Sequence, residues 1–259
     1  MLSKIPLAIV VLTLAVCSVS CFPENRVVNG TDTDITAYPF MVSLRGRSGS
    51  HWCGSTIIAP RWILTAAHCV SGRLASDLTI EYASTNVNVN GTNVVGIKRF
   101  IIHEDYNESQ SYANDIALLE LYGRLIYNYK TLAPVTLPES YFEIDQVAAG
   151  SPGVLAGWGF NATDGVVQTH LQSVNLKIYS DDECQIRHNY ATTVNQICGG
   201  VDEGGKGHCN GDSGGPLLYK GAVQVGIVSW SVKPCTIAPY PGVYTKVSHY
   251  IDWIRKHIE

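Results

Sequence analysis

The stretch Gly211-Asp-Ser213-Gly-Gly-Pro carries the most specific signal in this sequence. A serine that acts as a nucleophile needs an exposed Oγ and nearby backbone N–H groups that can hold a developing oxyanion. Flanking glycines let the chain turn tightly and let a carbonyl group approach the backbone closely. A Gly-x-Ser-x-Gly pattern often marks nothing more than a turn, but the longer string is much rarer. The sequence therefore makes Ser213 a candidate nucleophile.

Two earlier stretches contain groups that would activate such a serine. Thr65-Ala-Ala-His68-Cys69 follows an apolar run and offers a base. Asn114-Asp115-Ile-Ala-Leu-Leu places a carboxylate, which could orient that base, at the start of another apolar run. Alone, His68 is more often structural or solvated, and Asp115 could simply end a turn. The three signals together, in the order His, Asp, Ser, favour a catalytic triad.

These motifs resemble those of the chymotrypsin/trypsin family, and the likeness extends from Val27 to Glu259. The resemblance, not the spacing, implies the roles: His68 is the general base, Asp115 orients it and Ser213 attacks, as in that family's established triad. The N–H groups of Gly211 and Ser213 would form the oxyanion hole. The implied fold is all-β, with two six-stranded antiparallel Greek-key barrels, a cleft between them and a C-terminal helix. The implied activity is that of a serine endopeptidase that works through an acyl-enzyme.

Local patterns are consistent with that fold. Segments rich in β-branched residues, separated by Gly-rich turns, predict strands at 94–102, 224–230 and 242–247. Ser180-Asp-Asp-Glu is a capping-box pattern that predicts the start of a helix. Ser248 could cap a C-terminal helix whose apolar face contains Ile251, Ile254 and Ile258. This face predicts a helix that packs on a β core.

The N-terminal residues have the pattern of a signal peptide. Lys4 precedes a short apolar run, and small residues follow it. We expect a signal peptide at 1–20, an activation propeptide at 21–26 and one protease domain at 27–259, whose two halves meet near residue 135. The run is too short to span a bilayer, so a secreted, extracellular protein is favoured over a membrane anchor. Sequons predict candidate glycosylation sites at Asn29, Asn90, Asn107 and Asn161.

The stretch Arg26-Val27-Val-Asn-Gly resembles the activation site of the family. Cleavage after Arg26 by a trypsin-like protease would give Val27 a free amine, which the resemblance pairs with the Asp212 carboxylate. In zymogens of this family a His and a Ser hold that carboxylate before cleavage, and His51 and Ser43 match them. The chain is therefore expected to be made as an inactive zymogen.

Eight cysteines are present. Cys17 would leave with the signal peptide, and Cys21 would be its last residue or a thiol in the propeptide. The remaining six allow fifteen pairings, which the sequence alone leaves open. The family resemblance implies the pairs Cys53–Cys69, Cys184–Cys198 and Cys209–Cys235. It also implies that a bridge frequent in the family is missing, because Gly153 and Tyr219 occupy both of its positions.

Specificity is expected to depend on a pocket for the residue before the scissile bond (P1). In trypsin-like relatives an Asp lies six residues before the nucleophile, but here that residue is Gly207. A buried Lys or Arg side chain would therefore lack a partner, which argues against tryptic cleavage. Gly207 and Gly242 predict an open, uncharged pocket. It would accept Phe, Tyr or Leu first, smaller aliphatic side chains second and acidic ones third.

Four further residues add to this expectation. His208 is expected to be a partly solvated wall residue, and the alternative is a protonated histidine that accepts Glu or Asp. Ser231 stands where the family usually has Gly, at the rim, and could narrow the entrance. Ser229-Trp230 resembles the strand that pairs with the substrate backbone beside the pocket.

The composition and charge exclude other functional classes. Of 259 residues, 46% are hydrophobic and 15% are charged, which is enough apolar material for a sizeable core. The net charge is −4 and no Lys/Arg cluster is present, so no nucleic-acid partner is expected. No metal or cofactor is expected either. The stretch 84–93, where the family's calcium loop would fall, has no acid, and the histidines lack ligand spacing.

Other functions were weighed on the same residues. A catalytically weak relative that acts as a secreted binding protein is the main alternative, but such proteins usually lack a triad residue. A structural glycoprotein would have no use for an activation site. The expected partners are protein or peptide substrates, an activating trypsin-like protease and protein inhibitors, and a monomer is expected. The short propeptide resembles that of digestive or venom-type secreted proteases.

Overall fold

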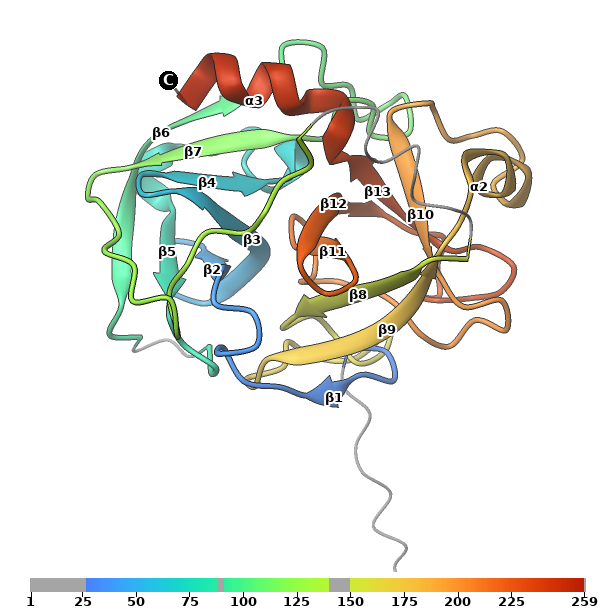
Figure 1. Ribbon diagram of the computed structural model, residues 1–259, viewed down its shortest axis with the longest axis horizontal. Coiled ribbons are helices and arrows are strands. Elements are labelled where there is room, and N and C mark those ends of the chain that lie inside the picture. Colours follow the sequence, from blue (N-terminus) through green and yellow to red (C-terminus); the bar gives the residue numbers. More distant parts are fainter. Residues whose placement is uncertain (1–26, 88–90, 140–149, 259) are drawn as a thin grey trace, which may run out of the picture.

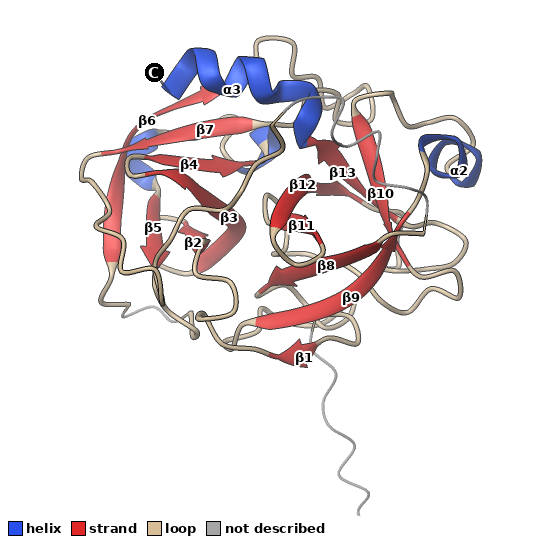
Figure 2. Ribbon diagram, viewed as in Figure 1, coloured by secondary structure: helices blue, strands red, loops and turns tan. Residues whose placement is uncertain are grey.

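The computed structural model describes residues 27–87, 91–139 and 150–258. Two β-barrels lie side by side, and a C-terminal helix lies against the first of them (Figures 1 and 2). The predicted signal peptide and propeptide, with Arg26, lie outside the described residues, and so does the sequon at Asn90.

The first barrel is closed and antiparallel throughout. Its strands are, in order around the barrel, β2 (Met41–Arg45), β3 (His51–Ala59), β4 (Trp62–Thr65), β7 (Ala117–Leu121), β6 (Val94–Ile102) and β5 (Thr79–Tyr82). Side chains that alternate along these strands point inward and exclude water from the interior. The fully buried side chains on these strands, on either face, include Leu44, Ile57, Ile63, Leu64, Ile80 and Leu118. The strand predicted at 94–102 is confirmed as β6.

The second barrel is closed by pairing of β8 with both β9 and β11. Its strands are, in order, β8 (Pro152–Gly157), β9 (Gln172–Ile178), β10 (Gln196–Gly200), β13 (Gly242–Lys246), β12 (Val223–Trp230) and β11 (Pro216–Tyr219). The short strand β1 (Thr31–Asp32) pairs with the start of β9. The predicted fold of two six-stranded barrels is therefore confirmed. The strands predicted at 224–230 and 242–247 are β12 and β13, each different by one residue at one end.

The helix start predicted at Ser180 is confirmed at α2 (Asp181–Arg187). Ser180 Oγ accepts a hydrogen bond from the Glu183 N–H at 3.2 Å, and Glu183 Oε2 accepts one from the Ser180 N–H at 3.3 Å. This reciprocal capping box satisfies two backbone donors at the end of the helix. Shorter 3₁₀ helices occur at Ala67–Cys69, Ala75–Asp77 and Val247–Tyr250.

The C-terminal helix α3 (Ile251–Ile258) follows the last strand of the second barrel but packs against the first (Figure 1). Ile251 and Ile254 are buried in the core of the first barrel, and Ile258 is partly buried against it, so the predicted apolar face is confirmed. The predicted cap by Ser248 is wrong. Ser248 lies within the 3₁₀ helix Val247–Tyr250, and its Oγ is buried with no hydrogen-bond partner.

The two barrels meet through β3 and the strands β11 and β12. Thr56 Oγ1 on β3 donates a hydrogen bond to Gln224 Oε1 on β12 at 2.7 Å, and both side chains are fully buried. The Gly54 N–H, also on β3, donates to the Ser213 carbonyl at 2.8 Å. A Cβ at Gly54 would lie only 2.9 Å from Gly215 Cα, so a larger residue would force the barrels apart.

The structure contains three disulfides, and they are the pairs that the family resemblance implied. Cys53–Cys69 joins β3 to the 3₁₀ helix Ala67–Cys69, Cys184–Cys198 joins α2 to β10, and Cys209–Cys235 joins two loops of the second half. Gly153 and Tyr219, at the positions of the missing bridge, are register partners on β8 and β11. The two positions therefore face each other, as the alignment with the family requires.

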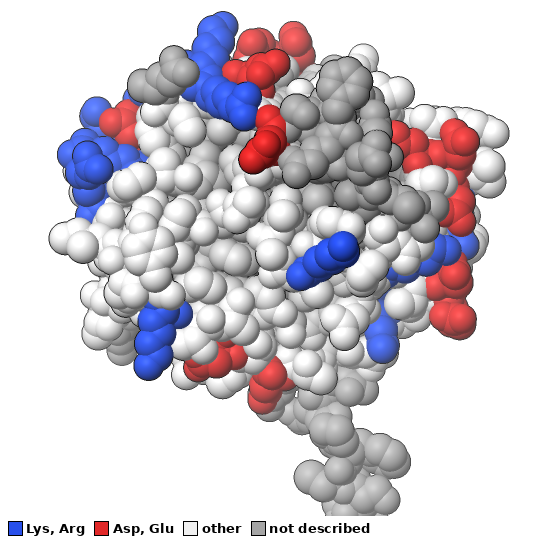
Figure 3. Space-filling model, viewed as in Figure 1, with Lys and Arg blue, Asp and Glu red and all other residues white. Residues whose placement is uncertain are grey.

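The surface carries few charges in the region that faces the viewer in Figure 3, where Lys, Arg, Asp and Glu lie mostly toward the edge of the outline. Among the described residues, no helix has the length and apolar character needed to cross a bilayer.

Leu118→Ala should lower the free energy of unfolding by about 2–5 kcal/mol, because Leu118 is fully buried in the first barrel and its truncation leaves a cavity. Leu74→Ala is the matched control. Leu74 is 64% exposed, so its truncation should change stability by less than about 0.5 kcal/mol. Urea unfolding followed by tryptophan fluorescence would measure both, and equal losses would contradict this placement of the core.

Candidate active site

The Asp115 carboxylate is fully buried and accepts three hydrogen bonds. The His68 N–H lies 2.9 Å from Oδ1, and His68 Nδ1 lies 2.7 Å from Oδ2. The third donor is the hydroxyl of Ser229, from the second barrel, at 2.6 Å from Oδ2. Because a carboxylate only accepts, His68 Nδ1 must carry a proton. In the neutral ring this leaves the lone pair on Nε2, as a general base requires.

The loop before Asp115 is held in a strained backbone conformation. Ser111, Tyr112 and Asn114 have φ values of 51°, 56° and 55°, which non-glycine residues seldom adopt. Side chains from later in the chain hold Asn114 there: its Oδ1 accepts hydrogen bonds from Asn195 Nδ2 at 2.9 Å and from the Tyr250 hydroxyl at 2.8 Å. These residues were not predicted from the sequence, since nothing in their local pattern marks a contact with a distant loop.

His68 is partly exposed, and its ring lies edge-on to Tyr112, with centroids 5.6 Å apart. His68 and Ser213 both line one cavity of about 300 Å³. His68 reaches it from the end of β4 in the first barrel, whereas Ser213 lies in the loop between β10 and β11 of the second. Among the described residues, Ser213 Oγ has no hydrogen-bond partner. The predicted base and nucleophile therefore line the same cavity, but no hydrogen bond links them.

Two backbone donors beside Ser213 are free. The N–H groups of Asp212, Gly214 and Gly215 are all hydrogen-bonded to backbone carbonyls. In the described part of the chain, the N–H groups of Gly211 and Ser213 have no such partner. Gly211 has φ 90° and Gly214 φ 78°, conformations that favour glycine. The glycines of the motif therefore shape a turn that leaves two N–H groups available to an oxyanion.

His51 and Ser43 are hydrogen-bonded to each other, but they do not hold Asp212. His51 Nδ1 accepts from the Ser43 hydroxyl at 2.8 Å, and His51 Nε2 donates to the Gly211 carbonyl at 2.8 Å. Burial lowers the pKa of His51 to about 4, so the ring is neutral at pH 7. The zymogen contact expected between this pair and Asp212 is thus replaced by a contact that anchors the turn before Ser213.

The Asp212 side chain is fully buried beneath that turn. It accepts hydrogen bonds from the Gly159 N–H at 2.8 Å and the Cys209 N–H at 3.0 Å. Burial raises its pKa to about 7. No cation among the described residues forms an ion pair with it. A Cβ at Gly157 or Gly159 would collide with the carboxylate, so both glycines are needed for this close packing.

The segment after Arg26 is already inserted into the second barrel. Val27 is fully buried in its apolar cluster, and Val28 forms an isolated bridge with Gly207. The Asn29 side chain is exposed, and its amide donates to the Gly205 carbonyl at 2.6 Å. Glycosylation of Asn29, Asn107 and Asn161 remains a prediction.

The cavity that contains His68 and Ser213 extends along the predicted specificity pocket. Its wall includes Ser229, Trp230, Ser231 and His208. Lys233 also lines it, and its Nζ donates to Asn210 Oδ1 at 2.8 Å. No carboxylate is among the lining residues that the structure describes. Neither Gly207 nor Gly242 is among the described residues that line the cavity, and the expectation that both glycines leave the pocket open stays a prediction.

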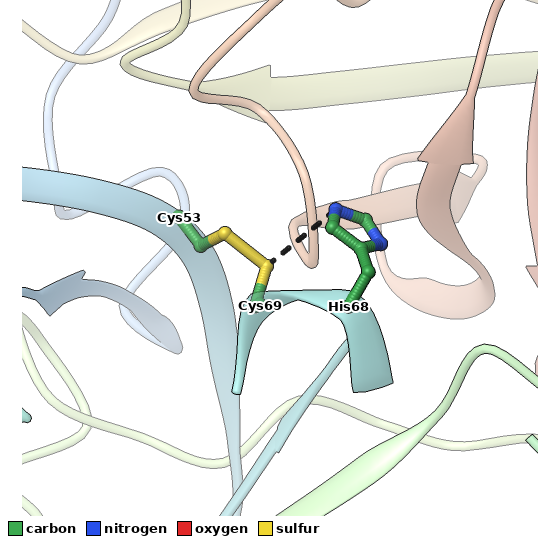
Figure 4. Close-up of side chains that lie close together, drawn as sticks. All are labelled: Cys53, His68 and Cys69. Atoms are coloured by element: carbon green, nitrogen blue, oxygen red, sulfur yellow. Dashed lines mark hydrogen bonds between the residues drawn. A yellow bond between two sulfur atoms is a disulfide. The ribbon is translucent and has the colours of Figure 1, made fainter. Parts of the chain in front are cut away.

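Figure 4 shows the one described group of three potential metal ligands, Cys53, His68 and Cys69. The two sulfur atoms are joined in a disulfide, so neither is a thiolate that could bind a metal. His68 Nε2 lies 3.8 Å from Cys69 Sγ. The disulfide therefore packs beside the imidazole and ties its 3₁₀ helix to β3.

Comparison with known proteins agrees with this geometry. The family model described as Trypsin matches residues 27–254. The chain is 37% identical over 237 residues to Trypsin II-P29 of Gallus gallus. The aligned region covers 91% of this chain and 90% of that protein. The chain is also 37% identical over 231 residues to Chymotrypsin-2 of Vespa crabro, which covers 89% of this chain and 99% of that protein. The chain therefore belongs to the trypsin family of serine endopeptidases.

Proposed function

We propose that this protein is a secreted serine endopeptidase, made as a zymogen, that cleaves after aromatic or large aliphatic residues through an acyl-enzyme at Ser213. The observation that carries the proposal is the set of hydrogen bonds at Asp115. They orient the His68 ring in the wall of the cavity that also contains Ser213. A buried carboxylate, an oriented imidazole and an adjacent serine are the parts that acyl transfer requires.

The proposed reaction follows the established chemistry of the family. Ser213 Oγ attacks the carbonyl carbon of the scissile bond, and His68 Nε2 takes the hydroxyl proton. Asp115 stays ionised and stabilises the imidazolium that forms. The oxyanion accepts hydrogen bonds from the Gly211 and Ser213 N–H groups. His68 then gives its proton to the leaving amine, the C–N bond breaks, and a water molecule releases the acyl group from Ser213 by the same steps.

The proposed P1 preference rests on the charges around the cavity. Lys233 is the cation at its rim, and its described lining includes no carboxylate. A Lys or Arg side chain would lose its hydration there without gaining a partner. An aromatic or aliphatic side chain loses only contact with water, which is favourable.

The proposed activation rests on the burial of Asp212. A carboxylate that is fully buried without a cation is costly. Val28 pairs with Gly207, in the loop that leads to Asp212, so the preceding residue enters the same region. After cleavage at Arg26, the Val27 amine would supply the missing cation and stabilise the turn at Ser213. Secretion is proposed from the signal-peptide pattern and is consistent with three disulfides.

Ser213→Ala should lower kcat of the cleaved protein by about 10³-fold or more, because the acyl-enzyme cannot form. The assay is peptide hydrolysis by protein with a sequenced Val27 N-terminus, together with labelling by a fluorophosphonate. The wild type should label at Ser213, and the variant should not. Failure of the cleaved wild type to label or to hydrolyse any peptide would favour the alternative of a secreted binding protein.

A panel of peptides that differ only at P1 should be cleaved at Phe, Tyr or Leu about 10²-fold faster, in kcat/KM, than at Lys or Arg. The reason is the absence of a carboxylate among the described residues of the cavity wall. Preference for Arg would show that a cation is accommodated and would contradict the proposed specificity.

The uncleaved protein should lose stability as the pH rises from about 4 to about 7. The pKa of Asp212 is about 7 in the folded chain, against 3.8 for an ordinary Asp. The protonated Asp212 side chain therefore contributes its full share to the free energy of unfolding below pH 3.8. This contribution is lost as the pH rises through 7. Asp212→Asn is neutral at every pH, so the difference in unfolding free energy between wild type and variant should change by about 2–4 kcal/mol over this range.

Cleavage after Arg26 should remove this pH dependence, because an amine beside Asp212 favours the carboxylate. Denaturant unfolding of both forms at several pH values would measure it. If the free energy of unfolding fell with pH by the same amount in the cleaved and uncleaved proteins, the proposed pairing of Val27 with Asp212 would be contradicted.

A further inference from the structure

We propose that the His208 imidazole sets the depth of the P1 pocket by closing its far end, so that Leu is preferred to the longer Phe and Tyr. This inference rests on the proposed function and narrows it to one class of P1 side chain. It also assigns a specificity role to His208, which the sequence predicts to be a partly solvated wall residue.

The first argument is the position of the ring. His208 is only 4% exposed and still lines the cavity, so it forms an inner surface of the pocket and not its rim. A Cβ on Gly242 would overlap with His208 Nε2 and Cδ2. The imidazole therefore occupies the space that a glycine at 242 leaves empty. This is why Gly242 does not line the cavity, although it lies on the opposite wall.

The second argument is that close packing against neighbouring residues holds the His208 ring in place. It packs edge-on against Tyr244, with centroids 5.1 Å apart, and Tyr244 is itself fully buried. A Cβ on Gly226 would lie 2.8 Å from Tyr244 Cβ, so β12 in turn fixes Tyr244. The next residue, Cys209, is held by its disulfide to Cys235. A close-packed floor of this kind changes its depth only at a cost in packing.

The third argument is that the floor is uncharged. Burial lowers the pKa of His208 well below that of an ordinary histidine, to about 3, and the nearby Lys233 and His68 act in the same direction. Its Nε2 is buried against Gly242 with no hydrogen-bond partner. A Glu or Asp side chain would meet a neutral ring there, so the alternative of a protonated histidine that binds acidic residues is not favoured.

The pocket would therefore discriminate between apolar P1 side chains by their length. A neutral, closely packed ring at the end of the pocket favours binding of apolar P1 side chains that just reach it. Longer side chains would overlap with the ring, so their binding is disfavoured. Leu ends at Cδ, one bond beyond the Cγ atom at which a Phe or Tyr ring begins, so it needs less depth. Differences of one or a few carbon atoms in such a pocket change kcat/KM by about 10–200-fold.

The test uses the cleaved full chain and peptides that differ only at P1, with Leu, Met, Phe, Tyr, Ala or Glu. Active-site titration with a fluorophosphonate gives the concentration of competent enzyme for each variant. The wild type should cleave after Leu with higher kcat/KM than after Phe and Tyr. His208→Ala should raise the ratio of Phe to Leu by about 10-fold or more, because the far end opens.

Two further variants distinguish the cause. Gly242→Ala should push the ring into the pocket and lower kcat/KM for Leu by about 10-fold, with a smaller effect on Ala. Ser231→Gly widens the entrance only, so its ratio of Phe to Leu should stay close to that of the wild type. A shift with Ser231→Gly and none with His208→Ala would overturn the inference.

The outcomes also separate the inference from the function on which it rests. A wild type that titrates and hydrolyses peptides, but whose P1 order is the same in His208→Ala, would overturn the inference alone. A wild type that prefers Glu, and loses that preference in His208→Ala, would also overturn it, because the ring would then act as a cation. A wild type that neither titrates nor hydrolyses would contradict the proposed function itself.

Discussion

The buried Asp115 carboxylate accepts hydrogen bonds from both halves of the chain, and the geometry of the cleft depends on this meeting. His68 belongs to the first barrel, whereas Ser229 belongs to the second. The Thr245 hydroxyl, on β13, donates to the Asp115 carbonyl at 2.8 Å. A rotation of one barrel relative to the other would break these bonds and leave a charge unpaired in the interior, which is costly. The barrels are therefore held in register at the residue that orients the His68 ring.

Close backbone packing supports the same junction. Gly54 donates to the Ser213 carbonyl and touches Gly215, so the turn that contains Ser213 rests on β3 of the opposite barrel. On its other side the turn packs over Asp212, around which Gly157 and Gly159 fit without a Cβ. Glycine is required at these positions because side chains would occupy the volume of backbone or carboxylate atoms. The free N–H groups of the turn are a consequence of this packing.

Two neutral, buried histidines, His51 and His208, lie at the site, and each has a different role. His51 is neutral because it is buried, and this lets it bridge the Ser43 hydroxyl and the Gly211 carbonyl as acceptor and donor at once. His208 is neutral for the same reason but makes no such bridge, and its ring fills the space beside Gly242. His68 differs from both, since a carboxylate contacts it and part of its ring is exposed. Burial and partner, not residue type, decide what each imidazole can do.

The sequence alone was sufficient to identify the strands at β6, β12 and β13 and the capping box at Ser180 and to predict the triad, because each has a local pattern. The tertiary structure decided features that depend on residues far apart in the chain. They include the hydrogen bond of His51 to the Gly211 carbonyl and the hydrogen bond of Asn195 to Asn114. The packing of the His208 ring against Gly242 is a third such feature. The physical reason is that spacing specifies which face of a strand or helix a side chain occupies. The partner it meets there is set by how the two barrels pack.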